Sequence, residues 1–253
     1  MVGLCTLLFA ASAALTISWS ASMSSMGGMP MPGGWTMSMV WMRTPDQTWL
    51  GAAASFLGMW IVMMVAMMMP LLVPMLWRYR QAVGRTGGTP LALLTALVGA
   101  GYFFVWTAFG LAAFPLGVAL ADAEMRTPLL SRAVPIAAAV VVLIAGALQF
   151  TAWKARHLAC CRMMPARRDP LAADAGTAWW HGLRLGVHCC YCCAGLMTIL
   201  LVTGVMDLRA MALVTAAITI ERFAPAGERA ARAIGAAAVG AGIILIARAA
   251  GLA

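Results

Sequence analysis

The sequence predicts an all-α polytopic membrane protein, a bundle of about seven transmembrane helices. Of its 253 residues, 63% are hydrophobic and only 10% are charged, whereas about a quarter of the residues in an ordinary soluble domain are charged. Because a helix crosses the hydrocarbon core with about 20 apolar residues, this length allows six or seven spans joined by short connections. A separate soluble enzyme domain does not fit into the remaining residues.

Apolar runs give the expected spans in order along the chain. They occupy residues 1–21, 50–77, 90–120, 130–153, 183–206, 208–221 and 231–250, and the sixth is the shortest. Pro70 and Pro74 lie inside the second run. Each proline removes a backbone donor and clashes with the preceding turn, so we expect this span to be kinked.

Residues 1–49 form the first of two expected units. Their apolar run has no basic segment before it, and Ala21 and Ser22 give only a weak cleavage signal. A retained signal-anchor and a cleaved signal peptide are therefore both open, and we favour the retained helix. A Met-rich loop, expected to face outward, completes this unit. Residues 50–253 form the second unit, the predicted metal-binding helix bundle.

Basic residues predict the orientation of the chain in the membrane. Twelve of the 17 lie in three connections that share one side if all seven runs cross: Arg78, Arg80, Arg85, Lys154, Arg156, Arg162, Arg167, Arg168, Arg184, Arg222, Arg229 and Arg232. Because cytoplasmic loops carry the excess of Lys and Arg, we expect a multi-pass protein of the bacterial inner membrane with its N-terminus inside and its C-terminus outside. The lipid bilayer is then the expected partner. Basic residues scattered between apolar runs argue against nucleic-acid binding, despite the net charge of +9.

Methionine is enriched, and fourteen of the 21 Met residues lie between Met23 and Met75. Seven of them occupy the Gly/Pro/Ser-rich outward loop: Met23, Met26, Met29, Met31, Met37, Met39 and Met42. A thioether is a soft ligand that selects Cu(I) and needs no deprotonation, so this loop could gather Cu(I) on the periplasmic side of the membrane. The alternative is an apolar loop that dips into the lipid headgroups, with Trp35, Trp41 and Trp49 as interfacial anchors.

A second group of methionines runs along the second span. Met59, Met63 and Met67 are spaced four residues apart, and Met64 and Met68 form a second such pair. Residues four apart stack on one helix face, about 6 Å apart along the axis. These thioethers therefore form a ladder that could pass a soft cation between several weak sites. The alternative is that they fill gaps between neighbouring spans, which is the ordinary role of a single buried Met.

Six of the seven Cys residues fall into two groups that also contain His. The first group opens the fifth span and comprises His188, Cys189, Cys190, Cys192, Cys193 and Met197. The second ends the fourth span and comprises His157, Cys160 and Cys161. Both lie toward the expected cytoplasmic side, where thiols stay reduced. Two helix ends that carry these ligands could jointly bind Cu(I), with Zn as the alternative ion.

Three sequence blocks carry a resemblance to a known family. The second span reads Trp60-x2-Met63-x2-Ala66-Met67-Met68-x-Pro70-x3-Pro74. The fourth run ends Gln149-x4-Lys154-x6-Cys161-Arg162, and the fifth reads Cys189-x2-Cys192-Cys193-x3-Met197, followed by Gly204-Val205-Met206. From about residue 50 to 245 the chain resembles a bacterial family of predicted metal-binding integral membrane proteins, a domain of unknown function. The resemblance implies a bound metal, often taken to be copper, but no mechanism.

The chain departs from that family pattern at a few positions. His157 stands where a Cys is expected, which exchanges one metal ligand for another. Cys190 and Tyr191 replace an aliphatic residue and a Gly, and Ala194 replaces a Trp. The additional thiol makes the expected site softer.

Two functions remain after the absent motifs are considered. No ATP-binding, dinucleotide-binding or phosphorylated-Asp motif occurs, and three His are few for a copper enzyme, so we predict a protein that is not an enzyme. Asp207 and Glu221, near the ends of the sixth run, are too few for a proton relay. One function is transport or handover of Cu(I) across the inner membrane, through the ladder to the Cys/His group and on to a copper chaperone. The other is a non-transporting accessory or structural subunit of a copper enzyme complex.

Overall fold

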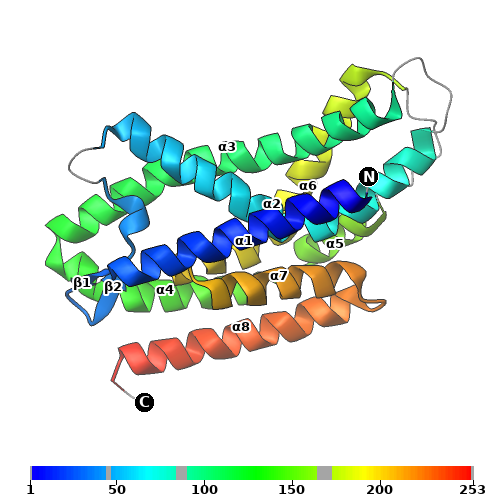
Figure 1. Ribbon diagram of the computed structural model, residues 1–253. Coiled ribbons are helices and arrows are strands. Elements are labelled where there is room, and N and C mark those ends of the chain that lie inside the picture. Colours follow the sequence, from blue (N-terminus) through cyan, green and yellow to red (C-terminus); the bar gives the residue numbers. More distant parts are fainter. Residues whose placement is uncertain (1, 44–46, 84–89, 164–172, 252–253) are drawn as a thin grey trace.

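The computed structural model describes residues 2–43, 47–83, 90–163 and 173–251, and these are mostly helical (Figure 1). The elements in chain order are α1 (Val2–Met26), β1 (Met29–Met31), β2 (Trp35–Met37), the 3₁₀ turn η1 (Met39–Trp41), α2 (Trp49–Val83), α3 (Leu91–Arg126), α4 (Pro128–Leu148), α5 (Ala152–Met163), α6 (Ala175–Thr203), α7 (Leu208–Phe223) and α8 (Gly227–Ala249). The all-α prediction is confirmed.

The number of membrane spans differs from the expected seven. Among the described residues, six helices are long and apolar enough to cross a membrane, namely α1, α2, α3, α4, α6 and α8. The remaining expected span, residues 208–221, forms α7, which has 16 residues. At 1.5 Å per residue such a helix is about 24 Å long, shorter than a hydrocarbon core of about 30 Å. The count of seven is therefore not confirmed.

The fourth expected span is shorter than its apolar run. α4 ends at Leu148, and residues 149–151 form a turn in which the N–H groups of Phe150 and Thr151 bond to the carbonyls of Ala147 and Leu148. A separate helix, α5, then begins. The ligands expected at the end of the fourth span therefore lie on α5. The structure carries α2 through Pro70 and Pro74 as one helix, and the kink expected there stays a prediction.

The Met-rich loop contains a short antiparallel hairpin. Met29 pairs with Met37, and Met31 pairs with Trp35. Gly33 and Gly34 make the turn with φ angles of 110° and 76°, a backbone region that glycine adopts without a steric penalty. The Trp35 indole donates to the Ser131 carbonyl at 2.9 Å, which fastens the hairpin to the start of α4.

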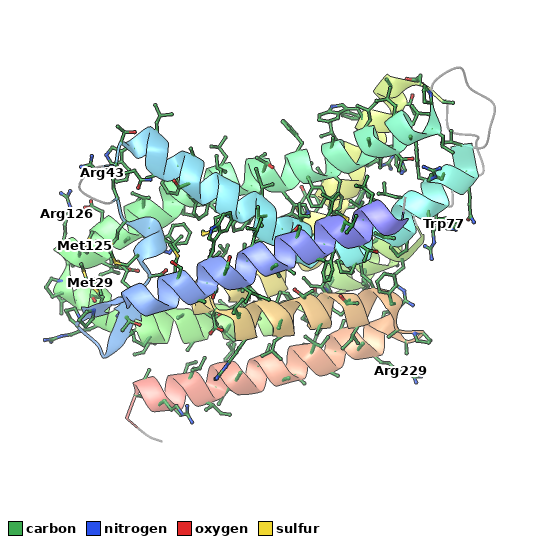
Figure 2. All side chains as sticks on the ribbon, viewed as in Figure 1. Met29, Arg43, Trp77, Met125, Arg126 and Arg229 are labelled. Atoms are coloured by element: carbon green, nitrogen blue, oxygen red, sulfur yellow. The ribbon has the colours of Figure 1, made fainter. Side chains whose placement is uncertain are left out.

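Long helices that follow one another along the chain run in opposite directions, and the two chain termini lie at opposite ends of the bundle (Figure 1). The end that holds the N-terminus also holds the end of α2, all of α5 and the start of α8, and we call it the basic end. The opposite end holds the β1–β2 hairpin, and we call it the hairpin end. Arg229 lies at the basic end, whereas Arg43 and Arg126 lie at the hairpin end (Figure 2). This arrangement agrees with the expected separation of basic residues, although Arg85, Arg167 and Arg168 fall outside the described residues.

Glycines let α3 and α6 approach closely in the middle of the bundle. A Cβ atom on Gly101 would lie 2.7 Å from the Trp179 carbonyl, and one on Gly186 would lie 2.9 Å from the Tyr102 carbonyl. Small residues commonly permit such approaches in membrane bundles. The consequence here is that the Tyr102 side chain of α3 reaches the cysteines of α6.

Reporter fusions can establish how often the chain crosses the membrane. A phosphatase that is active only outside the cytoplasm should be active when inserted between Gly33 and Gly34 and inactive when inserted between α5 and α6. The activity of a phosphatase fused to the C-terminus depends on whether α7 crosses the membrane. If α7 crosses, as the basic residues predict, the C-terminal fusion is active. An inactive C-terminal fusion, with the other two as expected, would establish six crossings.

Candidate metal centre

The structure brings the two expected groups of Cys and His together where α5 packs against α6. The Cys161 thiol donates to the His188 carbonyl at 3.3 Å, and the Cys160 Sγ lies 3.9 Å from His188 Nδ1. α6 itself begins at Ala175, where the Asp174 carboxylate accepts the Thr177 N–H at 2.8 Å and caps the helix. This hydrogen bond holds the pKa of Asp174 below its usual value.

Burial separates the candidate ligands into two clusters. The first, which we call the inner thiol cluster, consists of residues at most 3% exposed: Cys161, Cys189, Cys192, Cys193 and Met197. The Sγ atoms of Cys189 and Cys193 lie 3.8 Å apart, and Cys192, the residue before Cys193, is 2% exposed. All of these thiols are free. The cluster therefore presents several soft ligands inside the protein.

The second cluster, which we call the peripheral His cluster, is partly exposed and comprises His157, Cys160 and His188. The His157 and His188 ring centroids lie 6.3 Å apart. The His157 ring also contacts Trp153 and Tyr191, at centroid distances of 4.7 Å and 5.2 Å. These ring contacts restrict how His157 turns. Cys190, which the sequence also predicted as a ligand, is half-buried at the edge of the core and belongs to neither cluster.

A buried ion pair lies beside the inner thiol cluster. The Lys154 ammonium donates to the Glu221 carboxylate at 2.6 Å and to the Cys192 carbonyl at 2.7 Å. Lys154 is 4% exposed and Glu221 is 1% exposed. Lys154 belongs to α5, Glu221 to α7 and Cys192 to α6, so the ion pair and its hydrogen bond hold three helices together. The sequence analysis placed Lys154 in a basic connection and Glu221 near the end of the sixth run, and only their packing shows that both are buried.

Arg222 supplies a second buried positive charge, which the sequence analysis also did not recognise. Its side chain is buried, and its Nη1 donates to the Met75 Sδ at 3.6 Å. Within the part of the chain that the structure describes, Nε and Nη2 have no hydrogen-bond partner. The guanidinium lies close enough to Cys161, Cys189 and Cys193 for its charge to act on thiolates at these positions. A buried charge is costly unless it is paired, so thiolates at these positions would complement Arg222.

Tyr102 and Cys161 complete the hydrogen bonding of the inner thiol cluster. The Tyr102 hydroxyl lies 3.0 Å from the Cys189 Sγ. On α5, hydrogen bonding to Cys192 and burial raise the pKa of the Cys161 thiol. The Cys161 thiol therefore stays protonated and donates its hydrogen bond to the His188 carbonyl. A metal must displace that proton before it can bind this sulfur.

The methionine ladder lies inside the bundle. Met63, Met64 and Met68 are fully buried, Met67 is 4% exposed and Met59 is 9% exposed. They share one apolar core with Cys189, Cys193 and Met197. Farther along α2, Met75 contacts Arg222, so the series of thioethers ends beside the inner thiol cluster. A ladder that faces the bundle fits the transport function expected from the sequence, although packing alone also buries Met on this central helix.

The geometry allows metal binding after small movements. Among the described residues, no group of three or more His, Cys, Asp or Glu side chains could hold a metal ion as it stands. Two sulfur atoms that each lie about 2.3 Å from a metal are at most about 4.6 Å apart. The 3.8 Å between Cys189 and Cys193 is within this limit. These two sulfurs can therefore share one ion without a rearrangement of α6.

Fold and site together define a helical protein of membrane-spanning character with a buried, sulfur-rich cluster. Residues 57–245 match the model of PpoB2, a copper chaperone family, and the chain belongs to this family. The copper-related resemblance expected from the sequence is thus supported, whereas the family name differs from the one that the motifs suggested. No curated protein and no solved structure matches the chain.

The buried ion pair leads to a prediction about stability. Lys154→Met leaves the Glu221 carboxylate buried without its partner, and removing one member of a buried pair costs about 3–5 kcal/mol. We expect K154M to lower the midpoint of thermal unfolding in detergent. The double variant K154M/E221L removes both charges and should recover most of the loss. A K154M protein as stable as the unmodified chain would contradict the pairing.

Proposed function

We propose that the protein carries Cu(I) through the bacterial inner membrane and hands it to a cytosolic acceptor, with the inner thiol cluster as its principal binding site. One observation carries this proposal: a cluster of five buried sulfur ligands lies beside a buried guanidinium, two of whose nitrogen atoms have no hydrogen-bond partner among the described residues. Membership of a copper chaperone family supports copper as the ion. In this proposal the protein is a carrier and not an enzyme.

Charge favours Cu(I) at the inner thiol cluster. A Cu(I) ion held by the thiolates of Cys189 and Cys193 has one net negative charge, which Arg222 compensates. A Zn²⁺ ion on the same two thiolates would be neutral and would leave the guanidinium without a counter-charge. The Met197 thioether, which is also buried, is a soft ligand that favours Cu(I) further.

The ladder provides a route to this site. Its thioethers are buried in the same core as the inner thiol cluster, so an ion moving between them stays within the protein. Thioethers bind Cu(I) more weakly than thiolates, and several weak sites in series are what conduction requires. The ion therefore passes from neutral ligands to anionic ones and is held more tightly at the end of its path.

The peripheral His cluster is suited to release. Cys160 and His188 are partly exposed, lie at the α5–α6 contact and are adjacent to Cys161 and Cys189 in the chain. An exposed ligand pair lets an acceptor, such as a soluble copper chaperone, take the ion by exchange of ligands. In this scheme the inner thiol cluster holds copper and the peripheral His cluster passes it on.

Copper affinity tests the role of the inner thiol cluster. In anaerobic competition with a chromophoric Cu(I) chelator, C189S/C193S should lose tight binding together with the ultraviolet thiolate-to-copper absorption. The control C5S replaces a buried Cys of α1 and should bind normally. R222M keeps every ligand and should weaken binding by about 10- to 100-fold, the usual effect of changing a residue behind a metal ligand. Unchanged affinity in R222M would contradict the proposed charge compensation.

Uptake of Cu(I) into proteoliposomes tests the ladder. M63L/M67L conserves volume and hydrophobicity, so it costs little in packing but removes two thioethers. We expect a slower initial uptake at unchanged protein content, whereas M69L/M211L, which replaces two other buried Met residues, should transport normally. Normal uptake by M63L/M67L would assign the ladder to packing. The protein would then be better described as a non-transporting accessory subunit of a copper enzyme complex.

A further inference from the structure

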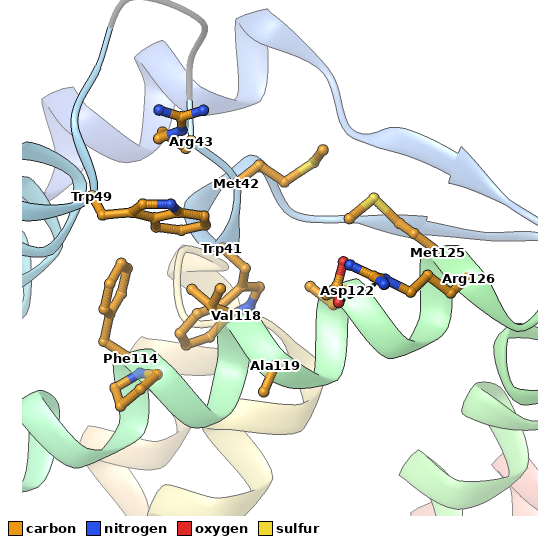
Figure 3. Close-up of a pocket in the computed structure, with 12 residues that line it drawn as sticks. Trp41, Met42, Arg43, Trp49, Phe114, Val118, Ala119, Asp122, Met125 and Arg126 are labelled. Atoms are coloured by element: carbon orange, nitrogen blue, oxygen red, sulfur yellow. Dashed lines mark ion pairs between the residues drawn. The ribbon is translucent and has the colours of Figure 1, made fainter.

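A pocket opens at the hairpin end, far from the two clusters described above (Figure 3). Its volume is about 590 Å³, and it lies between η1, the start of α2 and the last turns of α3. We call it the outer pocket. Its lining residues include Trp41, Met42, Trp49, Phe114, Val118 and Met125. The pocket therefore combines an aromatic wall with two thioethers.

The two thioethers come from separate parts of the chain. Met42 caps η1, and its N–H donates to the Met39 carbonyl at 3.1 Å. Met125 lies in the last turn of α3 and is 44% exposed. Figure 3 shows both side chains reaching toward the space between them. The sequence placed Met42 in a flexible Met-rich loop and gave no role to Met125, so only the fold reveals this pair.

The charged residues of the outer pocket leave the thioethers free. The Arg126 Nε bonds the Asp122 carboxylate at 2.8 Å, so these charges offset each other. The Arg43 guanidinium lies 5.5 Å from the Trp49 ring and donates to the Gln47 carbonyl at 3.1 Å. Arg43 is exposed, and its charge is therefore screened by solvent. A thioether is neutral, so it binds a soft cation without first losing a proton.

An aromatic column connects the outer pocket to the ladder. Phe56 lies 5.3 Å from Trp41 and 5.1 Å from Phe114 in the pocket wall, measured between ring centroids. On its other side Phe56 stacks on Trp60 at 5.8 Å. Trp60 is fully buried and directly follows Met59. A series of ring contacts thus leads from the wall of the pocket to the start of the ladder, and aromatic faces attract cations.

We propose that the outer pocket is the site where Cu(I) first binds from outside, held between the thioethers of Met42 and Met125. The inference rests on the proposed function for the identity of the ion and for the direction of entry. It does not depend on the inner thiol cluster, because the pair is a separate site at the other end of the bundle. The pocket, rather than the whole Met-rich loop, is then the entrance to the ladder.

Methyl-¹³C methionine NMR of the full chain in nanodiscs tests this site directly. Cu(I) is diamagnetic, so each Met methyl signal reports binding at its own sulfur, and single Leu variants assign the signals. In the C189S/C193S background, anaerobic Cu(I) should shift the Met42 and Met125 signals with the same concentration dependence. The signals of Met29 and Met39, which are exposed at the same end but do not line the pocket, should not move.

M42L provides the decisive comparison. If the two sulfurs share one ion, M42L should raise the Cu(I) concentration that half-shifts the Met125 signal by at least about tenfold, since changes behind a metal ligand already cost about 10- to 100-fold. An unaffected Met125 titration, or equal shifts at Met29 and Met39, would overturn the proposal. The unmodified protein, titrated beyond saturation of its thiolate absorption, gives the same test if the double Ser variant does not fold. Absent thiolate absorption there would refute the proposed function separately.

Discussion

Lys154 and Glu221 are an ammonium and a carboxylate that face each other in the interior of a largely apolar bundle. Neither charge is tolerated there alone, so α5 and α7 must stay in contact. The same ammonium holds the Cys192 carbonyl, which adds α6 to this contact. The position of every ligand in the inner thiol cluster therefore depends on this ion pair. Arg222, the residue after Glu221, is placed against the thiols by the same contact.

The sequence predicts the class of this fold well, because membrane helices obey simple limits of length and polarity. A run of about 20 apolar residues has few alternatives to a spanning helix, and the described part of the chain contains six such helices. The limits of α4 and the length of α7 were less predictable. The apolar run continues past Leu148 into a turn, and 208–221 is apolar but too short for hydropathy alone to decide whether it crosses.

The sequence predicted which Cys and His residues the structure brings together, but it predicted neither the buried charges beside them nor their division into two clusters. Spacing of four residues places Cys189, Cys193 and Met197 on one helix face, and the structure buries all three. Spacing within one helix cannot show that Cys161 joins them while Cys160 turns outward to His188, because that depends on how α5 packs on α6. Likewise, adjacent charges such as Glu221 and Arg222 are typical of a loop, and only their neighbours reveal a buried pair and a buried guanidinium.

The contact between Arg222 and Met75 affects how fast copper could leave the ladder. A Cu(I) ion on the Met75 sulfur would face the guanidinium, and two such charges 4 Å apart repel by about 4 kcal/mol at an effective dielectric constant of 20. Thiolates at Cys189 and Cys193 would draw the guanidinium toward themselves and lower this repulsion. Once a Cu(I) ion is bound by the thiolates, their attraction for the guanidinium weakens. The repulsion between the guanidinium and a second ion on Met75 then rises again. Arg222 would then act as an electrostatic gate that admits one ion at a time.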